Sequence, residues 1–249
     1  MNHRHIVIVG ATSTIAEHCA RLWATRESAR LTLVGRSHER LQRVATDLSV
    51  RAPDAVARWL CVDLLSPADI AATTQALAAE GPIDQVLIAH GDLPHQLDCQ
   101  QDLSLAEQAL RVNALSPVLW AEAFAGHMER ANHGRLAVIG SVAGDRGRRS
   151  NYVYGAAKGL VERYLQGLQH RFAATAVKVT LIKPGPTATA MTAHLNAQGM
   201  ALADPQDVAR RIVKAMDRGQ RVCHAPARWR WIMALLTALP ASLFNRLDI

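Results

Sequence analysis

Short runs of β-branched and other apolar residues alternate with longer helix-like stretches along the whole chain. We expect six buried parallel strands at Ile6–Val9, Leu31–Val34, Ala57–Val62, Gln85–Ile88, Leu136–Ile139 and Val177–Ile182. Helical patterns lie between and after them, at residues 14–26, 38–50, 67–79, 104–130, 152–173 and 205–218. Such alternation predicts a doubly wound parallel sheet with helices on both faces, a three-layer α/β fold. A length of 249 residues suits a single domain of this kind.

The cysteines and the N-terminus indicate a reducing, cytoplasmic setting. The four cysteines are scattered, without the spacing of a metal site, and we predict reduced, buried thiols and no bound metal. They are Cys19, Cys61, Cys99 and Cys223. The first apolar run, Ile6–Val9, is too short for the core of a signal peptide, so none is expected.

The net charge of +7 raises the question of nucleic-acid binding. The arginines are dispersed, and aromatic residues are interleaved with them only near the C-terminus, so no nucleic-acid partner is predicted. A basic surface also suits an anionic cofactor, an anionic substrate or an acidic membrane surface.

The segment Gly10–Ala16 directly follows the first strand and opens the first helix, which is where a dinucleotide site of a Rossmann-like fold is placed. Gly10 permits a tight turn, and the helix N-terminus offers N–H groups to a pyrophosphate. The hydroxyls of Thr12, Ser13 and Thr14 can donate to phosphate oxygens. An ordinary helix start capped by Ser or Thr is the alternative interpretation.

Arg36 stands at the end of the second strand, where an acidic residue would bind the ribose 2′-hydroxyl of NAD. A guanidinium suits a 2′-phosphate instead, so NADP(H) is predicted in preference to NAD(H). Arg36 could alternatively be a solvated surface residue. Asp63, after the third strand, could accept a hydrogen bond from an adenine amino group or could cap the next helix.

Ser141, Tyr154 and Lys158 form the most informative group in the chain. Ser141 ends the fifth strand, and Tyr154 and Lys158 lie four residues apart at the start of a helix, on one of its faces. An ammonium close to a phenol favours the phenolate and is expected to lower the pKa of Tyr154. A neighbouring hydroxyl could hold a substrate oxygen against the phenol. The three side chains therefore predict acid–base chemistry on a C–OH/C=O pair.

Five residues in this order and at these distances give the chain its resemblance to the short-chain dehydrogenase/reductase family of single-domain type. They are Gly10, Asn113, Ser141, Tyr154 and Lys158. The segment Lys183–Thr189 is similar to the family's P-G-x-x-x-T segment beside the nicotinamide. The resemblance covers nearly all of the chain.

The resemblance implies an NAD(P)-dependent oxidoreductase that interconverts a ketone and a secondary alcohol by hydride transfer. Tyr154 would be the general acid or base, Ser141 would bind the substrate oxygen, Lys158 would bind the nicotinamide ribose, and Asn113 would hold a water. The residues expected to bind the cofactor are Gly10, Thr12, Ser13, Thr14, Ile15, Arg36, Asp63, Leu64, Ala89, His90, Gly91, Tyr154, Lys158, Pro184, Gly185, Thr187 and Thr189. A homodimer or homotetramer is also implied.

Two departures from the family pattern stand out. Thr14 and Ala16 replace the second and third glycines of the turn, so Thr14 brings a side chain where the backbone usually approaches the cofactor. After the fourth strand the family's N-N-A-G is replaced by residues 88–91, in which only Gly91 survives. His90 is either a cofactor contact or a buried structural histidine. The departures resemble a branch of reductases for lipid-linked sugars, such as decaprenylphosphoryl 2-keto-ribose reductase.

The C-terminus is basic, Trp-flanked and apolar, and we divide the chain into a catalytic domain, 1–225, and a helical extension, 226–249. The run Trp229–Phe244 is too short to span a bilayer and contains Pro240. Two interpretations of this segment remain open. Residues 228–244 could contact a membrane peripherally, or the segment could pack over the pocket or in a subunit interface. The substrate is a small or lipid-like carbonyl or alcohol that the loop Ala190–Ala203 does not identify. A non-catalytic NADP-binding sensor or scaffold, or a membrane-surface interaction protein, is the rival function.

Overall fold

Seven parallel strands form one sheet in the order β3-β2-β1-β4-β5-β6-β7. The computed structural model describes residues 4–26, 29–193 and 200–247. The strands are β1 (Arg4–Val9), β2 (Ala29–Gly35), β3 (Val56–Cys61), β4 (Gln85–Ile88), β5 (Arg135–Ile139), β6 (Lys178–Pro184) and β7 (Val222–Ala225). Six of them were predicted, with ends displaced by at most two residues. The strand order confirms the doubly wound fold class.

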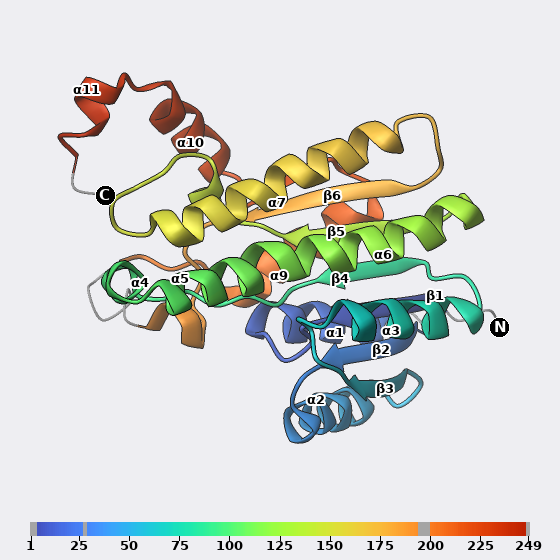
Figure 1. Cartoon of the computed structure of the whole chain (residues 1–249). Coiled ribbons are helices and arrows are strands. Elements are labelled where there is room, and N and C mark those ends of the chain that lie inside the picture. The colour runs from blue at the N-terminus through green and yellow to red at the C-terminus, as the bar shows by residue number, and fades with distance from the viewer. Residues whose placement is uncertain (1–3, 27–28, 194–199, 248–249) are drawn as a thin grey trace.

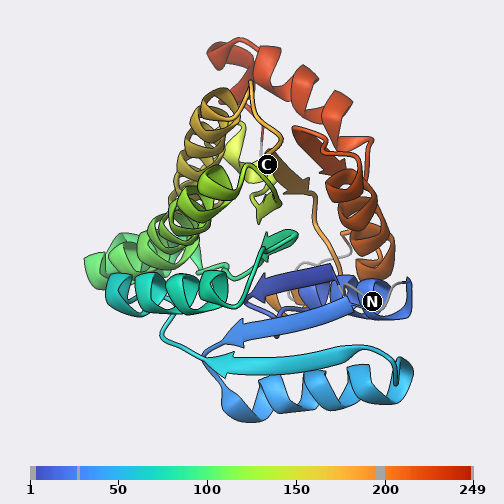
Figure 2. The same cartoon turned by 90° about the vertical axis from the view of Figure 1, so that its right-hand side faces the viewer.

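Helices cover both faces of the sheet and make the three layers visible in Figures 1 and 2. One face carries α1 (Thr14–Arg26), α2 (His38–Arg51) and α9 (Pro205–Asp217). The other carries α3 (Pro67–Ala79), α6 (Ser116–Ala131) and α7 (Tyr152–Arg171). Each layer has its own apolar core, because residues of the parallel strands point alternately to the two faces.

Three helices begin at a serine or aspartate whose side chain caps the N-terminus. The side chains of Ser37, Ser66 and Asp204 each accept a hydrogen bond from the first turn of α2, α3 and α9. A proline follows Ser66 and Asp204 at the first helical position, where its missing N–H has no cost. These caps fix where the chain turns from the carboxyl end of a strand into the next helix.

The predicted helix 104–130 is interrupted at its centre. It consists of α5 (Leu103–Leu110), a π-helical turn η1 (Arg111–Leu115) and α6. The N–H of Ser116 donates to the carbonyl of Arg111, five residues earlier. Pro117 has no N–H to donate to the carbonyl of Asn113, so the regular helical pattern cannot continue there. Asn113 is therefore displayed from a π turn, a feature that often marks functional positions.

Several shorter elements lack a clear sequence signal. The strand β7 is four residues long and has no β-branched run. The others are α4 (Gln96–Gln101), the 3-10 turns η2 (Val142–Gly144) and η3 (Ala190–Thr192), and the C-terminal helices α10 (Trp229–Ala238) and α11 (Ala241–Phe244). The expectation of four buried thiols is wrong for Cys61, which is exposed at the end of edge strand β3, although all four cysteines are free.

The strand order reverses between β1 and β4, which lie side by side at the centre of the sheet. In folds of this type, ligands bind outside the carboxyl ends of the strands near such a reversal. Figure 1 shows α4, α10 and α11 at this same end of the molecule. Of the loop Ala190–Ala203, residues 194–199 lie outside the described residues. Within the described part of the chain, no helix has the length and apolar character needed to cross a membrane.

Candidate active site

A cavity of about 490 Å³ opens at the carboxyl ends of the central strands. Every residue predicted from the sequence to contact cofactor or substrate lines it. From the first half of the chain these are Gly10, Thr12, Ser13, Thr14, Ile15, Arg36, Asp63, Leu64, Ala89, His90 and Gly91. From the second half they are Asn113, Ser141, Tyr154, Lys158, Pro184, Gly185, Thr187 and Thr189. The fold therefore brings the two sets of residues together.

The turn after β1 depends on glycine. Gly10 has a positive φ of 77°, and a Cβ there would lie 2.5 Å from the backbone nitrogen of His90. Its N–H donates to the carbonyl of Val34 at 2.8 Å, which fixes the turn against β2. The hydroxyl of Ser13 accepts a hydrogen bond from the N–H of Ala16 at 3.3 Å and so caps α1. The cap and a phosphate site are compatible, because the N-terminus of α1 still faces the cavity.

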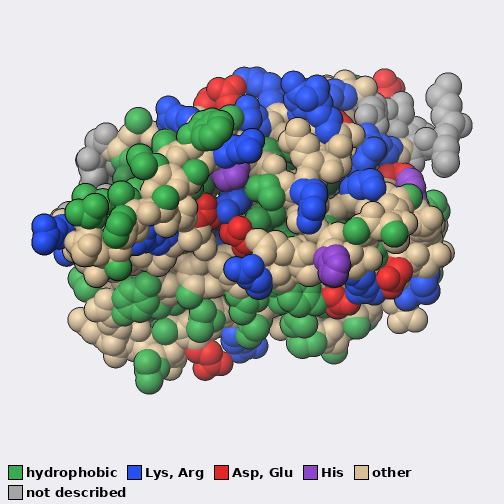
Figure 3. Space-filling model, turned by 90° about the horizontal axis from the view of Figure 1, so that it is seen from above, with side chains coloured by type: hydrophobic (Ala, Val, Ile, Leu, Met, Phe, Trp, Pro, Cys, Tyr) green, Lys and Arg blue, Asp and Glu red, His purple; other side chains and the backbone are tan. Residues whose placement is uncertain are grey.

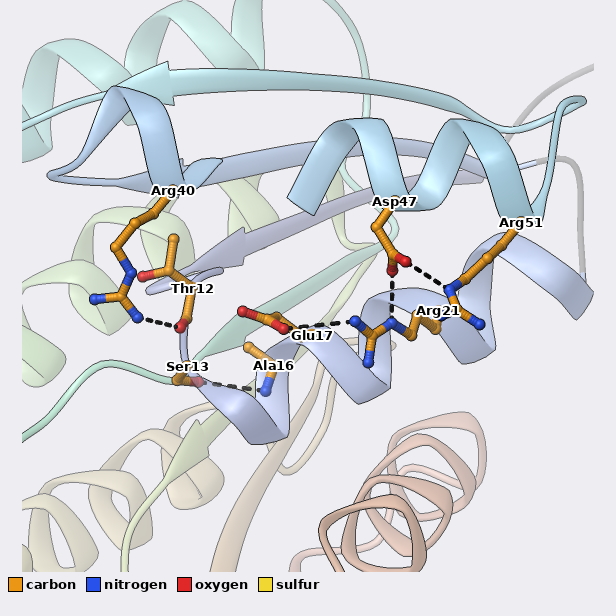
Figure 4. A network of polar contacts seen from close by, with 8 residues as sticks. All are labelled: Thr12, Ser13, Ala16, Glu17, Arg21, Arg40, Asp47 and Arg51. Atoms are coloured by element: carbon orange, nitrogen blue, oxygen red, sulfur yellow. Dashed lines mark hydrogen bonds and ion pairs between the residues drawn. The ribbon is translucent and has the colours of Figure 1, made fainter. Parts of the chain in front are cut away.

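The cavity wall beside β2 is positively charged. Arg36 is exposed at the end of β2, and Arg40 lies one turn further along. Arg40 donates from Nη2 to the carbonyl of Thr12 at 3.1 Å, and this contact joins the start of α2 to the turn before α1 (Figure 4). Asp63 accepts from the N–H of Leu65 at 2.9 Å; the cap of α3 is Ser66. The carboxylate of Asp63 thus shapes the loop that borders the cavity.

His90 is a partly buried histidine that borders the cavity. Its Nε2 lies 2.7 Å from the hydroxyl of Ser116, which donates to the carbonyl of Leu64 at 2.5 Å. Because that hydroxyl has given its proton to a carbonyl, Nε2 must carry a hydrogen and Nδ1 a lone pair. Burial, with Lys158 and Arg36 nearby, lowers the pKa of His90 to about 3 and keeps it neutral. Nδ1 is buried and has no partner among the described residues.

Ser141 and Tyr154 line the same cavity, and the hydroxyl of Ser141 lies close enough to favour the charged form of Tyr154. The oxygen of Ser141 also accepts from the N–H of Ala143 at 3.1 Å, so its proton is directed away from the backbone. The expectation of a lowered Tyr154 pKa is wrong for this structure. Burial raises the pKa of Tyr154 to about 12, while Ser141 and the cation of Arg148 oppose the rise. Desolvation of the phenolate outweighs the nearby positive charge.

Lys158 is buried, with 3% of its surface exposed. Its Nζ donates to the carbonyl of Ile139 at 3.1 Å and lies 5.7 Å from the centre of the Tyr154 ring. Burial lowers the pKa of Lys158 to about 8, and the carboxylate of Asp92 opposes this shift. An ammonium with a pKa near neutrality can exchange protons at working pH.

Asp92 is a site residue that sequence reasoning missed. It lines the cavity directly after Gly91, and its carboxylate accepts a short hydrogen bond from Nδ2 of Asn113. The N–H of Asp92 donates to Oδ1 of Asn113 at 3.0 Å, and Nδ2 of Asn113 also donates to the carbonyl of Ala109 at 3.0 Å. Both ends of the Asn113 amide are thereby fixed. The sequence feature that could have indicated Asp92 is its position directly after Gly91, the glycine that remains of the N-N-A-G segment.

The C-terminal helix α10 contributes a wall that the sequence did not predict in detail. Trp229 lines the cavity, and a Cβ on Gly185 would lie 1.9 Å from its Nε1. Arg146, in the loop before α7, donates to the carbonyls of Leu236 at 2.5 Å and Leu239 at 2.7 Å. Its guanidinium also lies 3.8 Å from the centre of the Phe244 ring. The C-terminal helices are therefore held against the loop that follows Ser141.

Together, the parallel sheet, the glycine turn before α1 and the tyrosine–lysine pair define a dinucleotide-binding α/β oxidoreductase of Rossmann type. A family model described as short chain dehydrogenase matches residues 4–199. The chain belongs to the short-chain dehydrogenase/reductase family, whose members are NAD(P)-dependent oxidoreductases.

Curated relatives extend the likeness to nearly the whole chain. An uncharacterized oxidoreductase of Mycobacterium tuberculosis is 30% identical over 97% of this chain and 96% of its own length. One of Streptomyces coelicolor is 28% identical over 99% of this chain and 96% of its own length. The extension after residue 225 thus has counterparts in these relatives.

Solved structures share the fold. A short-chain dehydrogenase from Sphingobium yanoikuyae, in complex with NADPH, has a TM-score of 0.80 at 24% identity, covering 96% of this chain and 97% of its own. The bulky-bulky ketone specific alcohol dehydrogenase from Comamonas testosteroni has a TM-score of 0.80 at 22% identity, covering 97% of each chain.

Proposed function

We propose that the protein reduces a ketone to a secondary alcohol, or catalyses the reverse reaction, with NADP(H). The observation that carries the proposal is that Ser141, Tyr154 and Lys158 line the same cavity as the glycine turn. NADPH, when bound, supplies the hydride. A sensor or scaffold would need the turn but not this acid–base group, so the enzyme is favoured.

The residues of the cavity fit a phosphorylated dinucleotide. Gly10 allows close approach at the N-terminus of α1, and Arg36 and Arg40 stand where a 2′-phosphate would extend past β2. No acidic residue follows β2 directly, since Arg36 and Ser37 occupy that place. The NADPH complex of the Sphingobium relative agrees with this choice. We therefore propose NADP(H) in preference to NAD(H).

Each catalytic role follows from position. In reduction, Tyr154 gives its phenolic proton to the carbonyl oxygen as that oxygen gains negative charge, and Ser141 donates a hydrogen bond to the same oxygen. Burial makes the phenolate costly, so Tyr154 rests in the protonated form that reduction requires. Lys158, with its lowered pKa, can restore the proton, and by its resemblance to the family it would bind the nicotinamide ribose. Asn113, clamped by Asp92, holds the π turn beside Lys158.

Replacing Tyr154 by phenylalanine tests this mechanism. Tyr154→Phe keeps the ring and removes the proton, so turnover should fall roughly 100-fold or more while NADPH binding persists. NADPH absorbance over a panel of ketones, with fluorescence titration for binding, measures both quantities. Tyr152→Phe is the matched control, because Tyr152 is exposed and does not line the cavity. Near-normal turnover in Tyr154→Phe would exclude the mechanism.

We further propose that the extension 226–249 closes one side of the pocket and presents an apolar outer face to a lipid surface. Trp231 is 72% exposed and Leu235 is 67% exposed on α10, while the exposed cations Arg228 and Arg230 lie beside them. Figure 3, seen from above α10 and α11, shows hydrophobic side chains gathered on this side with Lys and Arg among them. Apolar and basic side chains together suit an anionic membrane surface. A hydrophobic or lipid-linked substrate would fit this arrangement, as would a homodimer or homotetramer of the catalytic domain.

A further inference from the structure

A cation faces the cavity on the side where the substrate would lie. Arg148, in the loop between η2 and α7, lines the same cavity as Ser141 and Tyr154. The side chain is partly buried, and its Nε is fully buried without a hydrogen-bond partner among the described residues. Leaving a buried donor unpaired costs about 1–3 kcal/mol, more for a charged group. The Nε of Arg148 is therefore a donor for which the described residues supply no acceptor.

Asp145, the acid that influences Arg148 electrostatically, is already engaged elsewhere. Asp145 raises the pKa of Arg148 through space but forms a short ion pair with Lys183. Lys183 also pairs with Glu162 at 2.9 Å. Burial remains the largest influence and lowers the pKa of Arg148. Of the acids that line the cavity, Asp92 is bonded to Asn113 and Asp63 accepts from the N–H of Leu65. Arg148 thus remains a partly desolvated cation beside the reacting groups.

The start of α7 adds to the same positive region. Asn151 is the N-cap of this 20-residue helix, yet its side chain makes no hydrogen bond to the first turn. The side chain of Asn151 lines the cavity, but its buried Oδ1, which has no partner among the described residues, is an acceptor and does not add to the positive charge. Tyr154 lies in that first turn, so the positive end of the helix dipole and Arg148 both act where the substrate would meet the phenol.

We propose that the substrate carries an oxyanion, a carboxylate or a phosphate, close to the carbonyl that is reduced, and that Arg148 binds it. This inference rests on the proposed carbonyl reduction. A guanidinium can hold such a group through two parallel hydrogen bonds, which would satisfy its buried Nε. The oxyanion fixes one end of the substrate while Ser141 and Tyr154 hold the carbonyl oxygen.

Matched pairs of carbonyl compounds test the proposal. One pair is 2-oxobutanoate and its methyl ester; the other is dihydroxyacetone phosphate and dihydroxyacetone. We expect the intact protein to reduce the anionic member of at least one pair with a kcat/KM roughly 10- to 100-fold higher. The pair that shows the effect identifies the oxyanion. Arg148→Gln should abolish the preference, and Arg148→Lys should retain part of it. Arg149→Gln, which removes the same charge from an exposed neighbour outside the cavity wall, should leave it intact.

A binding measurement separates this proposal from the proposed reaction. Benzoate and benzamide are titrated calorimetrically into the protein with NADPH, and benzoate should bind at least tenfold more tightly. Tight benzoate binding without reduction of any carbonyl compound would refute the reaction and leave the anion site standing. Reduction of neutral ketones with no anionic preference in either pair would overturn the anion site and leave the reaction standing. An Arg148→Gln protein that loses stability but keeps the preference would also overturn the anion site, since Arg148 would then only balance the charge of Asp145.

Discussion

The buried ammonium of Lys158 should make the folded protein less stable than it would be with an uncharged side chain. Burial lowers the pKa of Lys158 from 10.5 to about 8, so the folded state binds this proton more weakly than the unfolded chain does. At about 1.4 kcal/mol for each pH unit of difference, protonated Lys158 costs the fold about 3 kcal/mol at neutral pH. Lys158→Met keeps the length of the side chain and removes the charge. We expect its free energy of unfolding at pH 7 to exceed that of the parent by about 2–4 kcal/mol.

The contribution of Lys158 to the free energy of unfolding changes with pH in a definite direction. Below about pH 8 both states hold the Lys158 proton, and the full cost is present. Between about 8 and 10.5 only the unfolded chain holds it, so this contribution to stability rises with pH across that window. The advantage of Lys158→Met should therefore shrink to about 1 kcal/mol near pH 9.5.

Urea unfolding followed by circular dichroism at pH 7 and pH 9.5 measures both values. Lys214→Met is the control, because Lys214 is exposed on α9 and its loss should change stability by less than about 1 kcal/mol at either pH. The variant should also be inactive in carbonyl reduction, which separates function from stability at this position. A Lys158→Met protein less stable than the parent at pH 7 would show that Lys158 is stabilising and would refute the reasoning.

Three further predictions concern the cofactor, the pocket wall and the C-terminal face. NADPH should bind more tightly than NADH in calorimetry, and Arg36→Ala should reduce the difference between the two affinities. Equal affinities in the parent would contradict binding of the 2′-phosphate by Arg36. Gly185→Ala should displace Trp229, shift the tryptophan fluorescence and lower the free energy of unfolding by roughly 1–3 kcal/mol. Gly167→Ala is the control: no atom lies within 4 Å of the added Cβ, so this variant should be neutral or stabilising. Unchanged fluorescence in Gly185→Ala would contradict the close contact with Trp229. The intact chain should sediment with anionic vesicles in a salt-sensitive way, and Trp231→Ser with Leu235→Ser should not; sedimentation of both alike would exclude this face.

The sequence predicted the sheet well, because buried parallel strands require continuous apolar runs and the caps Ser37, Ser66 and Asp204 punctuate the helices. Many residues predicted for the site follow strand ends, and they line one cavity because the carboxyl ends of parallel strands converge. The strand β7 was not predicted, because its four residues are of mixed polarity and too few to show a clear periodic pattern. The π turn was not predicted, because Pro117 is equally typical of the start of a helix.

Other features of the site depend on tertiary contacts that a linear pattern does not contain. The pKa of Tyr154 was expected to fall because Lys158 lies one turn away, but the depth of burial decides the direction. Asp92 could be recognised as a site residue only from its hydrogen bonds to Asn113. Trp229 lies far from the other cavity residues in the sequence and reaches them only because β7 returns the chain to the edge of the sheet.

The contacts of Arg146 have a mechanical consequence. Its guanidinium binds the carbonyls of Leu236 and Leu239 and lies over the ring of Phe244, so α10 cannot move outward without releasing it. Arg146 lies two residues before Arg148, on the segment that leads into α7. We therefore expect outward movement of α10 to loosen the segment that carries Arg148 as well. A tag or fusion that pulls on the C-terminus would then disturb the substrate side of the cavity.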